Sequence, residues 1–370
     1  MSGIYIHVPF CSSFCIYCDF YSVTECAQRG LYMEALEKEI IRRKDEIKGV
    51  PRTIYIGGGT PSLLSSDQLE TLVAILRKHF VLDNVEEFTM EVNPDDITPE
   101  YASNMFRLGI NRVSMGVQSF DDKNLKWMNR RHTSAQAEEA FRVLRRAGFD
   151  NISMDLIFGY KRVGVSDEDA FASWVEDIKR MIELRPEHIS AYQMSIEPGS
   201  ILAQMKDYQE PSQEYCSECY YKLLDLLEEG GYHHYEVSNF SLPGYHSRHN
   251  SSYWERIPYV GFGPAAHSFD GEGRCWNPED LGEYIAKSAT GWGGENMERL
   301  TDEEALEEKV MLGLRKISGV SLTEEEYREL RENAEHLAAK GLINLDSDLR
   351  HISVPREHLF ISDSIIAQII

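Results

Sequence analysis

No stretch of the 370-residue sequence reaches the roughly 18 uncharged apolar residues that a membrane-spanning helix requires, so we expect a soluble protein. The first residues, MSGIYIHV, contain neither the basic segment nor the apolar core of a secretory leader. Internal repeats and low-complexity tracts are absent as well. We therefore expect no export and a cytoplasmic location.

Basic side chains are outnumbered, because 38 lysines and arginines stand against 61 aspartates and glutamates, a net charge of −23. A field of this sign repels the phosphates of nucleic acids and of anionic lipids. The longest basic cluster, residues 142–146, is typical of the exposed face of a helix. The composition therefore predicts no nucleic-acid partner.

Cysteine is infrequent, and its distribution argues against a disulfide framework. The seven cysteines are an odd number, and three of them fall within eight residues. In a reducing compartment such crowding indicates metal or redox chemistry. The cysteines are Cys11, Cys15, Cys18, Cys26, Cys216, Cys219 and Cys275.

Apolar residues, 42% of the chain, suffice for a core, and the length predicts two domains or one large barrel with an appendage. Strand-like runs alternate with amphipathic stretches over the first 200 residues. The runs cover residues 4–9, 53–56, 87–92, 112–117, 151–157 and 188–196, and the predicted helices 32–48, 66–80, 99–108, 134–147 and 167–184. Six such units indicate a parallel sheet.

Polar residues at the strand ends favour a barrel over an open sheet. The six runs end at His7, the turn 57–60, Glu91, Gln118, Asp155 and Gln193. The carboxyl ends of the strands are where a βα barrel builds its chemistry. We therefore predict an α/β fold with a partial (βα)6 TIM-like barrel in residues 1–200.

The pattern changes after the predicted barrel. A connecting region, 201–300, begins with an amphipathic helix at 213–229 and continues as a loop-like tract. Residues 301–370 predict a winged-helix-like α+β domain, with helices at 302–314, 323–329 and 331–340 and a hairpin at 342–345 and 351–354. Its 15 acidic and 8 basic side chains argue against DNA binding and for packing against the barrel.

Cys11, Cys15 and Cys18 follow the spacing Cys-x3-Cys-x2-Cys at the end of the first predicted strand. Three thiolates from one short loop can hold three irons of a [4Fe–4S] cluster and leave the fourth iron open for another ligand. A zinc site with His7 as the fourth ligand is the alternative.

The segment around these cysteines, Tyr-x-His-x-Pro-Phe-Cys-x3-Cys-x-Tyr-Cys, resembles the signature of radical S-adenosylmethionine (SAM) proteins. It is most similar to the branch that contains anaerobic coproporphyrinogen III oxidase and the HemW-type heme chaperones. The resemblance covers nearly the whole chain. It implies that the open iron binds SAM and that an electron from the cluster cleaves SAM to a 5′-deoxyadenosyl radical.

The same resemblance assigns residues to the SAM pocket. Carboxylates suit ribose hydroxyls, arginine suits the carboxylate of SAM, and glycines let a ligand approach the backbone closely. The residues that match family positions lining this pocket are Tyr5, Tyr17, Gly58, Gly59, Thr60, Glu91, Gln118, Arg130 and Asp155.

Two features separate the chain from the oxidase and point to the heme chaperones. The oxidase motif has a further cysteine two positions after the third, where this chain has Phe20. Residues 249–254, His-Asn-Ser-Ser-Tyr-Trp, resemble the HNxxYW element whose histidine is implicated in holding heme. His249 is thus the predicted heme ligand, since imidazole is a common axial ligand of heme iron. The resemblance implies heme transfer to acceptor proteins such as respiratory enzymes. The alternative is oxygen-independent coproporphyrinogen III oxidation or another radical reaction of a tetrapyrrole.

The sequence leaves open whether SAM is cleaved or only bound, and with it whether the chain is an enzyme. It also allows a homodimer and a transient contact with the membrane during heme transfer. One segment departs from the family, because residues 159–174 replace a shorter Gly-Leu-Pro-Gly type loop. Cys216 and Cys219, three apart on a predicted helix, fit packing residues better than a second metal site.

Overall fold

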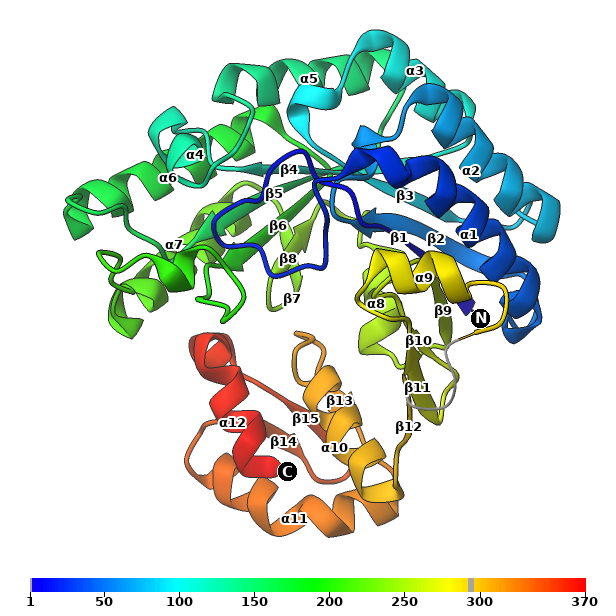
Figure 1. Ribbon diagram of the computed structural model, residues 1–370. Helices are drawn as coiled ribbons and strands as arrows, with labels where there is room; N and C mark the ends of the chain where they lie inside the picture. Colours follow the sequence, from blue (N-terminus) through cyan, green and yellow to red (C-terminus); the bar gives the residue numbers. More distant parts are fainter. Residues whose placement is uncertain (1, 292–295) are drawn as a thin grey trace.

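The computed structural model describes residues 2–291 and 296–370, which form a barrel-like layer of strands with a smaller domain beneath it (Figure 1). The sheet has twelve strands in the order β12-β11-β10-β9-β1-β2-β3-β4-β5-β6-β8-β7. Its centre is the predicted set of six parallel strands: β1 (Ser2–Val8), β2 (Pro51–Gly58), β3 (Glu87–Val92), β4 (Arg112–Gln118), β5 (Ile152–Phe158) and β6 (His188–Gln193).

Helices cover the outer face of these strands. They are α1 (Arg29–Arg43), α2 (Ser66–His79), α3 (Pro99–Arg107), α4 (Asp122–Trp127), α5 (Ser134–Ala147), α6 (Asp167–Leu184) and α7 (Gln213–Glu229). Local sequence explains their bounds: the Ser65 and Gln68 side chains form a reciprocal cap at the start of α2, and Gly148 ends α5 in the left-handed conformation. The short helix α4 was not predicted.

The strands alternate between the two faces of the sheet. In β1, Ile4 and Ile6 are completely buried in the core beneath the helices, whereas Tyr5 and His7 lie on the opposite, inner face. The inner face is therefore where polar side chains gather.

Strands from residues 201–300 extend this sheet at both edges. At one edge β8 (Asn239–Ser241) pairs antiparallel with β6 and is followed by β7 (His233–Glu236). At the other edge β9 (Tyr259–Phe262) pairs parallel with β1 and continues into β10 (His267–Phe269), β11 (Gly273–Trp276) and β12 (Met297–Arg299). Hydrogen bonds therefore join short strands of the loop-rich tract to the barrel at both edges of its sheet.

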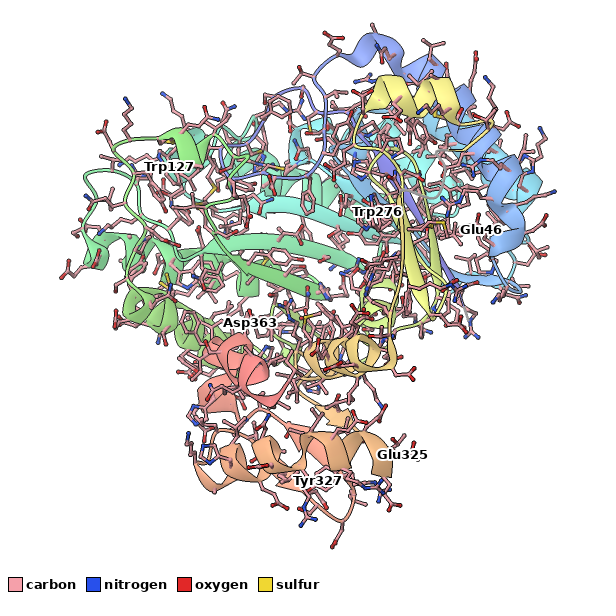
Figure 2. The ribbon with its side chains drawn as sticks, turned by 60° about the horizontal axis from the view of Figure 1, so that its bottom comes forward. Glu46, Trp127, Trp276, Glu325, Tyr327 and Asp363 are labelled. Carbon is pink, nitrogen blue, oxygen red and sulfur yellow. The ribbon has the colours of Figure 1, made fainter. Side chains whose placement is uncertain are left out.

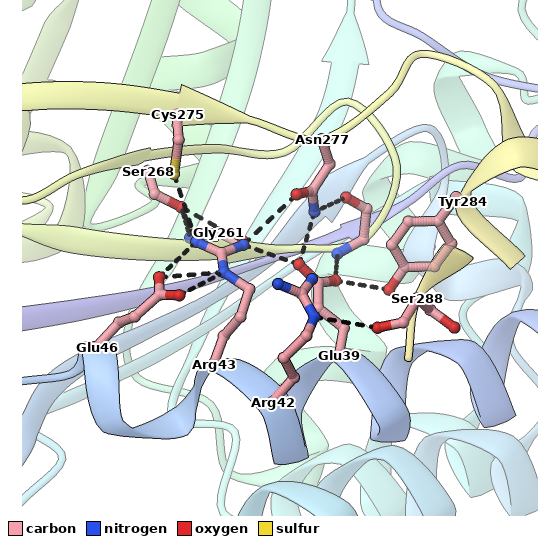
Figure 3. Close-up of polar contacts among 11 residues, drawn as sticks. Glu39, Arg42, Arg43, Glu46, Gly261, Ser268, Cys275, Asn277, Tyr284 and Ser288 are labelled. Carbon is pink, nitrogen blue, oxygen red and sulfur yellow. Dashed lines mark hydrogen bonds and ion pairs between the residues drawn. The ribbon is translucent and has the colours of Figure 1, made fainter. Parts of the chain in front are cut away.

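A buried polar network, centred on Glu39 and Arg43 of α1, holds these added strands against the barrel (Figure 3). Arg43 donates to Glu39, to the Gly261 carbonyl and to the Ser268 hydroxyl at 2.8–2.9 Å. Glu39 also accepts from the Gly263 N–H, the Asn277 amide and the Tyr284 hydroxyl of α9 (Leu281–Lys287). Every carboxylate oxygen of Glu39 therefore has partners, as a buried charge requires.

The C-terminal domain has the order α10 (Asp302–Gly313), β13 (Val320–Ser321), α11 (Glu324–Ala339), β14 (Asn344–Asp346), β15 (His351–Ser353) and α12 (Ser362–Ile369). The two helices predicted at 323–329 and 331–340 are one helix, because no glycine or proline interrupts the stretch. The third helix follows the hairpin instead of preceding it. Figure 2 shows α11, marked by Glu325 and Tyr327, on the side of this domain that faces away from the barrel. None of the helices in residues 2–291 and 296–370 combines the length and apolar character needed to cross a membrane.

Candidate functional site

A cavity of about 740 Å³ opens at the carboxyl ends of the central strands. The loop that carries the cysteines forms one wall, and inward-facing strand residues form the others. Eleven of the predicted site residues line it: Cys11, Cys15, Cys18, Tyr17, Gly58, Gly59, Thr60, Glu91, Gln118, Arg130 and Asp155. The segment 159–174, which departs from the family pattern, contributes no side chain to this lining.

The cysteine loop, residues 9–23, is fixed to its surroundings by backbone hydrogen bonds. The Cys11 N–H donates to the Val23 carbonyl at 3.0 Å, and the Ile16 N–H donates to the Met128 carbonyl at 3.2 Å. Leu202 in turn donates to the Ile16 carbonyl at 2.7 Å. The three thiols therefore have a defined position on one cavity wall, whereas Phe20 at the rim is 73% exposed.

The three thiols fit an iron–sulfur cluster better than a zinc ion with His7. His7 has both ring nitrogens in hydrogen bonds, Nδ1 with the Tyr5 hydroxyl at 3.1 Å and Nε2 with the Tyr21 carbonyl at 2.9 Å. Burial raises the pKa of the Cys18 thiol to about 11, so a thiolate there requires the positive charge of a metal. The zinc alternative therefore lacks its fourth ligand, and three cysteines facing one cavity leave room for the open iron of a cluster.

The glycine turn packs directly against the cysteine loop. A Cβ atom on Gly58, which has φ of 109°, would lie 2.7 Å from the His7 ring, and one on Gly59 would lie 2.9 Å from the Phe10 carbonyl oxygen. The Thr60 N–H donates to that same carbonyl at 2.8 Å. Glycine is thus required at position 58 by its positive φ and the nearby His7 ring, and at position 59 by the close approach of the Phe10 backbone, and the same turn lines the cavity.

Two half-buried carboxylates, Glu91 on β3 and Asp155 on β5, face the cavity from the two strands that flank β4. Glu91 accepts from the Tyr55 hydroxyl at 2.7 Å and from the Gly58 N–H at 3.1 Å. Burial raises the pKa of Glu91 to about 7 and that of Asp155 to about 6. The guanidinium of Arg112, 1% exposed, lowers both pKa values, and its Nε and Nη1 have no hydrogen-bond partner among the described residues. The carboxylates can accept hydrogen bonds from hydroxyl or ammonium groups of a ligand.

Gln118 and Arg130 complete this wall. The register of β4 shifts between Gly116 and Gln118, and Gln118 has φ of 70°, so a bulge turns its side chain toward the cavity. Arg130 donates to the Asn93 side chain and the Gly116 carbonyl at 2.6 Å and to the Cys15 sulfur at 3.3 Å. Its buried Nε has no partner among the described residues, which leaves a donor for an anionic ligand group.

Tyr5 and His249 are the predicted site residues that do not line the cavity. The Tyr5 hydroxyl bonds to His7, whose other ring nitrogen bonds to the Tyr21 carbonyl in the cysteine loop. His249, on α8 (Arg248–Trp254), is 1% exposed, with Nδ1 2.8 Å from the Thr53 hydroxyl and Nε2 2.8 Å from the Tyr253 hydroxyl. The structure therefore places the predicted heme ligand inside the protein, away from the mouth.

Sequence reasoning missed several residues of the site. Tyr55, Asn93, Ser114, Ser190, Tyr192 and Asn250 also line the cavity. Tyr55 stands between Ile54 and Ile56, so the period-two alternation of β2 could have placed it on the inner face. Asn250 belongs to the HNxxYW-like element, but nothing in the sequence indicates that this element reaches the cavity. Cys216 and Cys219, both 1% exposed, lie in the hydrophobic core, which confirms the prediction that they pack.

The sequence is similar to those of known proteins. The family model described as "Radical SAM superfamily" matches residues 5–175. The "Heme chaperone HemW" of Lactococcus lactis subsp. lactis (strain IL1403) is 38% identical over 323 residues, which are 86% of this chain and 83% of that protein. The protein of the same name from Bacillus subtilis (strain 168) is 36% identical over 361 residues, 93% of both chains.

A solved structure described as "Coproporphyrinogen III oxidase (HemN) from Escherichia coli is a Radical SAM enzyme" shares the fold. Its TM-score is 0.84 at 23% identity, and the match covers 99% of this chain and 89% of that one. This likeness confirms the predicted α/β barrel fold. The three cysteines share one cavity with the other predicted pocket residues that line it. Because the sequence similarity runs through nearly the full length of both chains, the chain belongs to the HemW family of radical SAM proteins.

Proposed function

We propose that this protein is a heme chaperone that binds heme and transfers it to acceptor proteins such as respiratory enzymes. The observation that carries the proposal is the similarity over 93% of both chains to a relative named "Heme chaperone HemW". Phe20 supports it, because this exposed ring stands where the resembled oxidase motif has a further cysteine.

The radical SAM family implies a [4Fe–4S] cluster and SAM, and the cavity residues divide into groups that fit both. Cys11, Cys15 and Cys18 would hold the cluster. Arg130, with its unpartnered Nε, would take the carboxylate of SAM, and Glu91 and Asp155 would accept from its hydroxyl and amino groups. When bound, the cluster and SAM would supply one-electron chemistry at the mouth, and Glu91, Asp155 and Arg130 would hold and orient the ligand there.

His249 is the heme ligand in this proposal. Burial lowers the pKa of its ring to about 3, so the imidazole is neutral and keeps the lone pair that iron requires. Both ring nitrogens are in hydrogen bonds and the side chain is buried. Heme binding at His249 therefore requires that α8 leave its place in the barrel.

The test is heme titration of the anaerobically reconstituted protein, followed by the Soret absorption. We expect one heme per chain, with a dissociation constant raised roughly tenfold or more by His249→Ala. The control is His336→Ala, an exposed histidine on α11. Absence of heme binding by the wild-type protein would contradict the proposal.

A second arm addresses the enzyme alternative. The same reconstituted protein, given reductant, SAM and coproporphyrinogen III, should return the substrate intact by mass spectrometry. A decarboxylated product would overturn the chaperone function and make the difference at Phe20 irrelevant.

A further inference from the structure

The helix that carries the HNxxYW-like element closes the barrel at the end opposite the cysteine loop. The backbone N–H groups of Arg248 and His249 donate to the carboxylate of Glu87, the first residue of β3, at 2.7 and 2.9 Å. Asn250, the next residue, lines the same cavity as the cysteines. One cavity thus reaches from the cysteine loop at the mouth to α8 at the floor.

The His249 ring lies inside the barrel against the backbone of β1. A Cβ atom on Gly3 would come within 3.2 Å of this ring, so the site is filled closely by imidazole. The ring stacks on Tyr55, with centroids 5.1 Å apart and an interplanar angle of 27°. Any movement of His249 out of the barrel removes this stacking partner from Tyr55.

Tyr55 also reaches the opposite part of the cavity. Its hydroxyl donates to Glu91 Oε1 at 2.7 Å, and Glu91 Oε2 accepts from the Gly58 N–H at 3.1 Å. A Cβ atom on Gly57 would lie 2.8 Å from the Tyr55 ring and 3.0 Å from the Glu91 carboxylate, so the two side chains are packed together against this strand. A contiguous path therefore connects the α8 histidine to the glycine turn.

We propose that Tyr55 is a positioning residue through which α8 controls the SAM pocket, so that heme ligation by His249 and SAM binding oppose each other. The heme half of this statement rests on the proposed function. With α8 in place, Tyr55 holds Glu91 in the orientation that faces SAM. When His249 leaves to ligate iron, Tyr55 loses its support and Glu91 loses its fixed orientation. By linkage, heme and SAM then weaken each other by the same factor.

The experiment measures two dissociation constants on the reconstituted holoprotein. The dissociation constant of heme is measured by Soret titration with and without saturating SAM. The dissociation constant of SAM is measured by equilibrium dialysis with and without heme. We expect both to rise by the same factor of at least about five, the lower end of measured allosteric couplings. Tyr55→Phe keeps the stacked ring but removes the hydrogen bond to Glu91, so it should weaken SAM binding and reduce the coupling factor toward one.

Tyr232→Phe is the matched control, because the Tyr232 hydroxyl donates to the Pro186 carbonyl at 2.7 Å in a buried place outside the cavity. It should leave both constants and their coupling unchanged. A second readout is the pH at which SAM affinity changes, which should move upward in Tyr55→Phe, since the lost hydrogen bond favours ionised Glu91.

The outcomes separate the coupling from the proposed function. Heme that binds with the same affinity in the presence and absence of SAM would overturn the coupling while leaving the chaperone function intact. Full coupling retained in Tyr55→Phe would overturn the path through Tyr55. A wild-type protein that binds no heme would overturn both, and the heme titration alone would reveal it.

Discussion

Removing the charge of Arg43 should destabilise the protein far more than removing an exposed arginine. Arg43 is 4% exposed and Glu39 is completely buried, so Arg43→Met leaves a carboxylate without its counter-ion in the core. Breaking a buried ion pair in this way costs about 3–5 kcal/mol. Glu39 keeps its three other donors, Gly263, Asn277 and Tyr284, at 2.7–2.9 Å, so we expect the lower end of that range, about 3 kcal/mol.

Urea unfolding of the metal-free chain, followed by circular dichroism, measures this loss. Arg142→Met is the control, because Arg142 is 49% exposed and pairs with Glu138 on the outer face of α5, where the change should stay within about 0.5 kcal/mol. The double variant Glu39→Leu/Arg43→Met should be less destabilised than the sum of the single changes, since no buried charge is then left alone. Equal stability of Arg43→Met and Arg142→Met would refute this view of the network.

Three further predictions concern the cavity. Burial raises the pKa of Glu91 to about 7, so between pH about 4.3 and that value the folded chain holds a proton that the unfolded chain has released. The free energy of unfolding of the metal-free chain should therefore fall as the pH rises through this window, and Glu91→Gln should remove that part of the slope in urea unfolding at several pH values. Arg130→Met removes the donor to the Cys15 sulfur and should lower bound iron and sulfide about tenfold at limiting iron, whereas Arg107→Met, on an exposed side chain, should not. Gly58→Ala should lower the free energy of unfolding by more than about 2 kcal/mol, because Gly58 has φ of 109° and an added Cβ would lie 2.7 Å from the His7 ring. The control Gly164→Ala, with φ of 80° and no atom within 4 Å of the added Cβ, should lower it by about 1 kcal/mol. Similar losses for the two variants would contradict the steric explanation.

The central sheet could be predicted because each of its strands carries its own signal. The run predicted at 87–92 is β3 itself, and Glu91 and Asp155 lie on the inner face because they alternate with apolar residues facing the helices. The cysteine spacing likewise identifies its site within eight residues. In these places the chemistry and the local pattern agree, so little tertiary information is needed.

The rest depends on contacts between distant residues. The pairing of β9 with β1 places Gly3 beside Tyr259, and neither segment has a sequence pattern that predicts which strand it pairs with. The burial of His249 depends on Glu87, Thr53 and Tyr55, which come from two strands far earlier in the chain. A motif of histidine, asparagine, tyrosine and tryptophan fits an exposed ligand site as well as a buried helix, so the sequence could not decide between them.

The parallel pairing of β1 with β9 has a consequence for the order of events during synthesis. The first strand to leave the ribosome has no partner along one of its edges until residues 259–262 have been made. Over the same period Glu39 and Arg43 lack the partners at Gly261, Ser268, Asn277 and Tyr284 that neutralise and satisfy them in the finished protein. A nascent chain that ends near residue 200 therefore carries an open strand edge and an incomplete polar core, both of which favour non-native association.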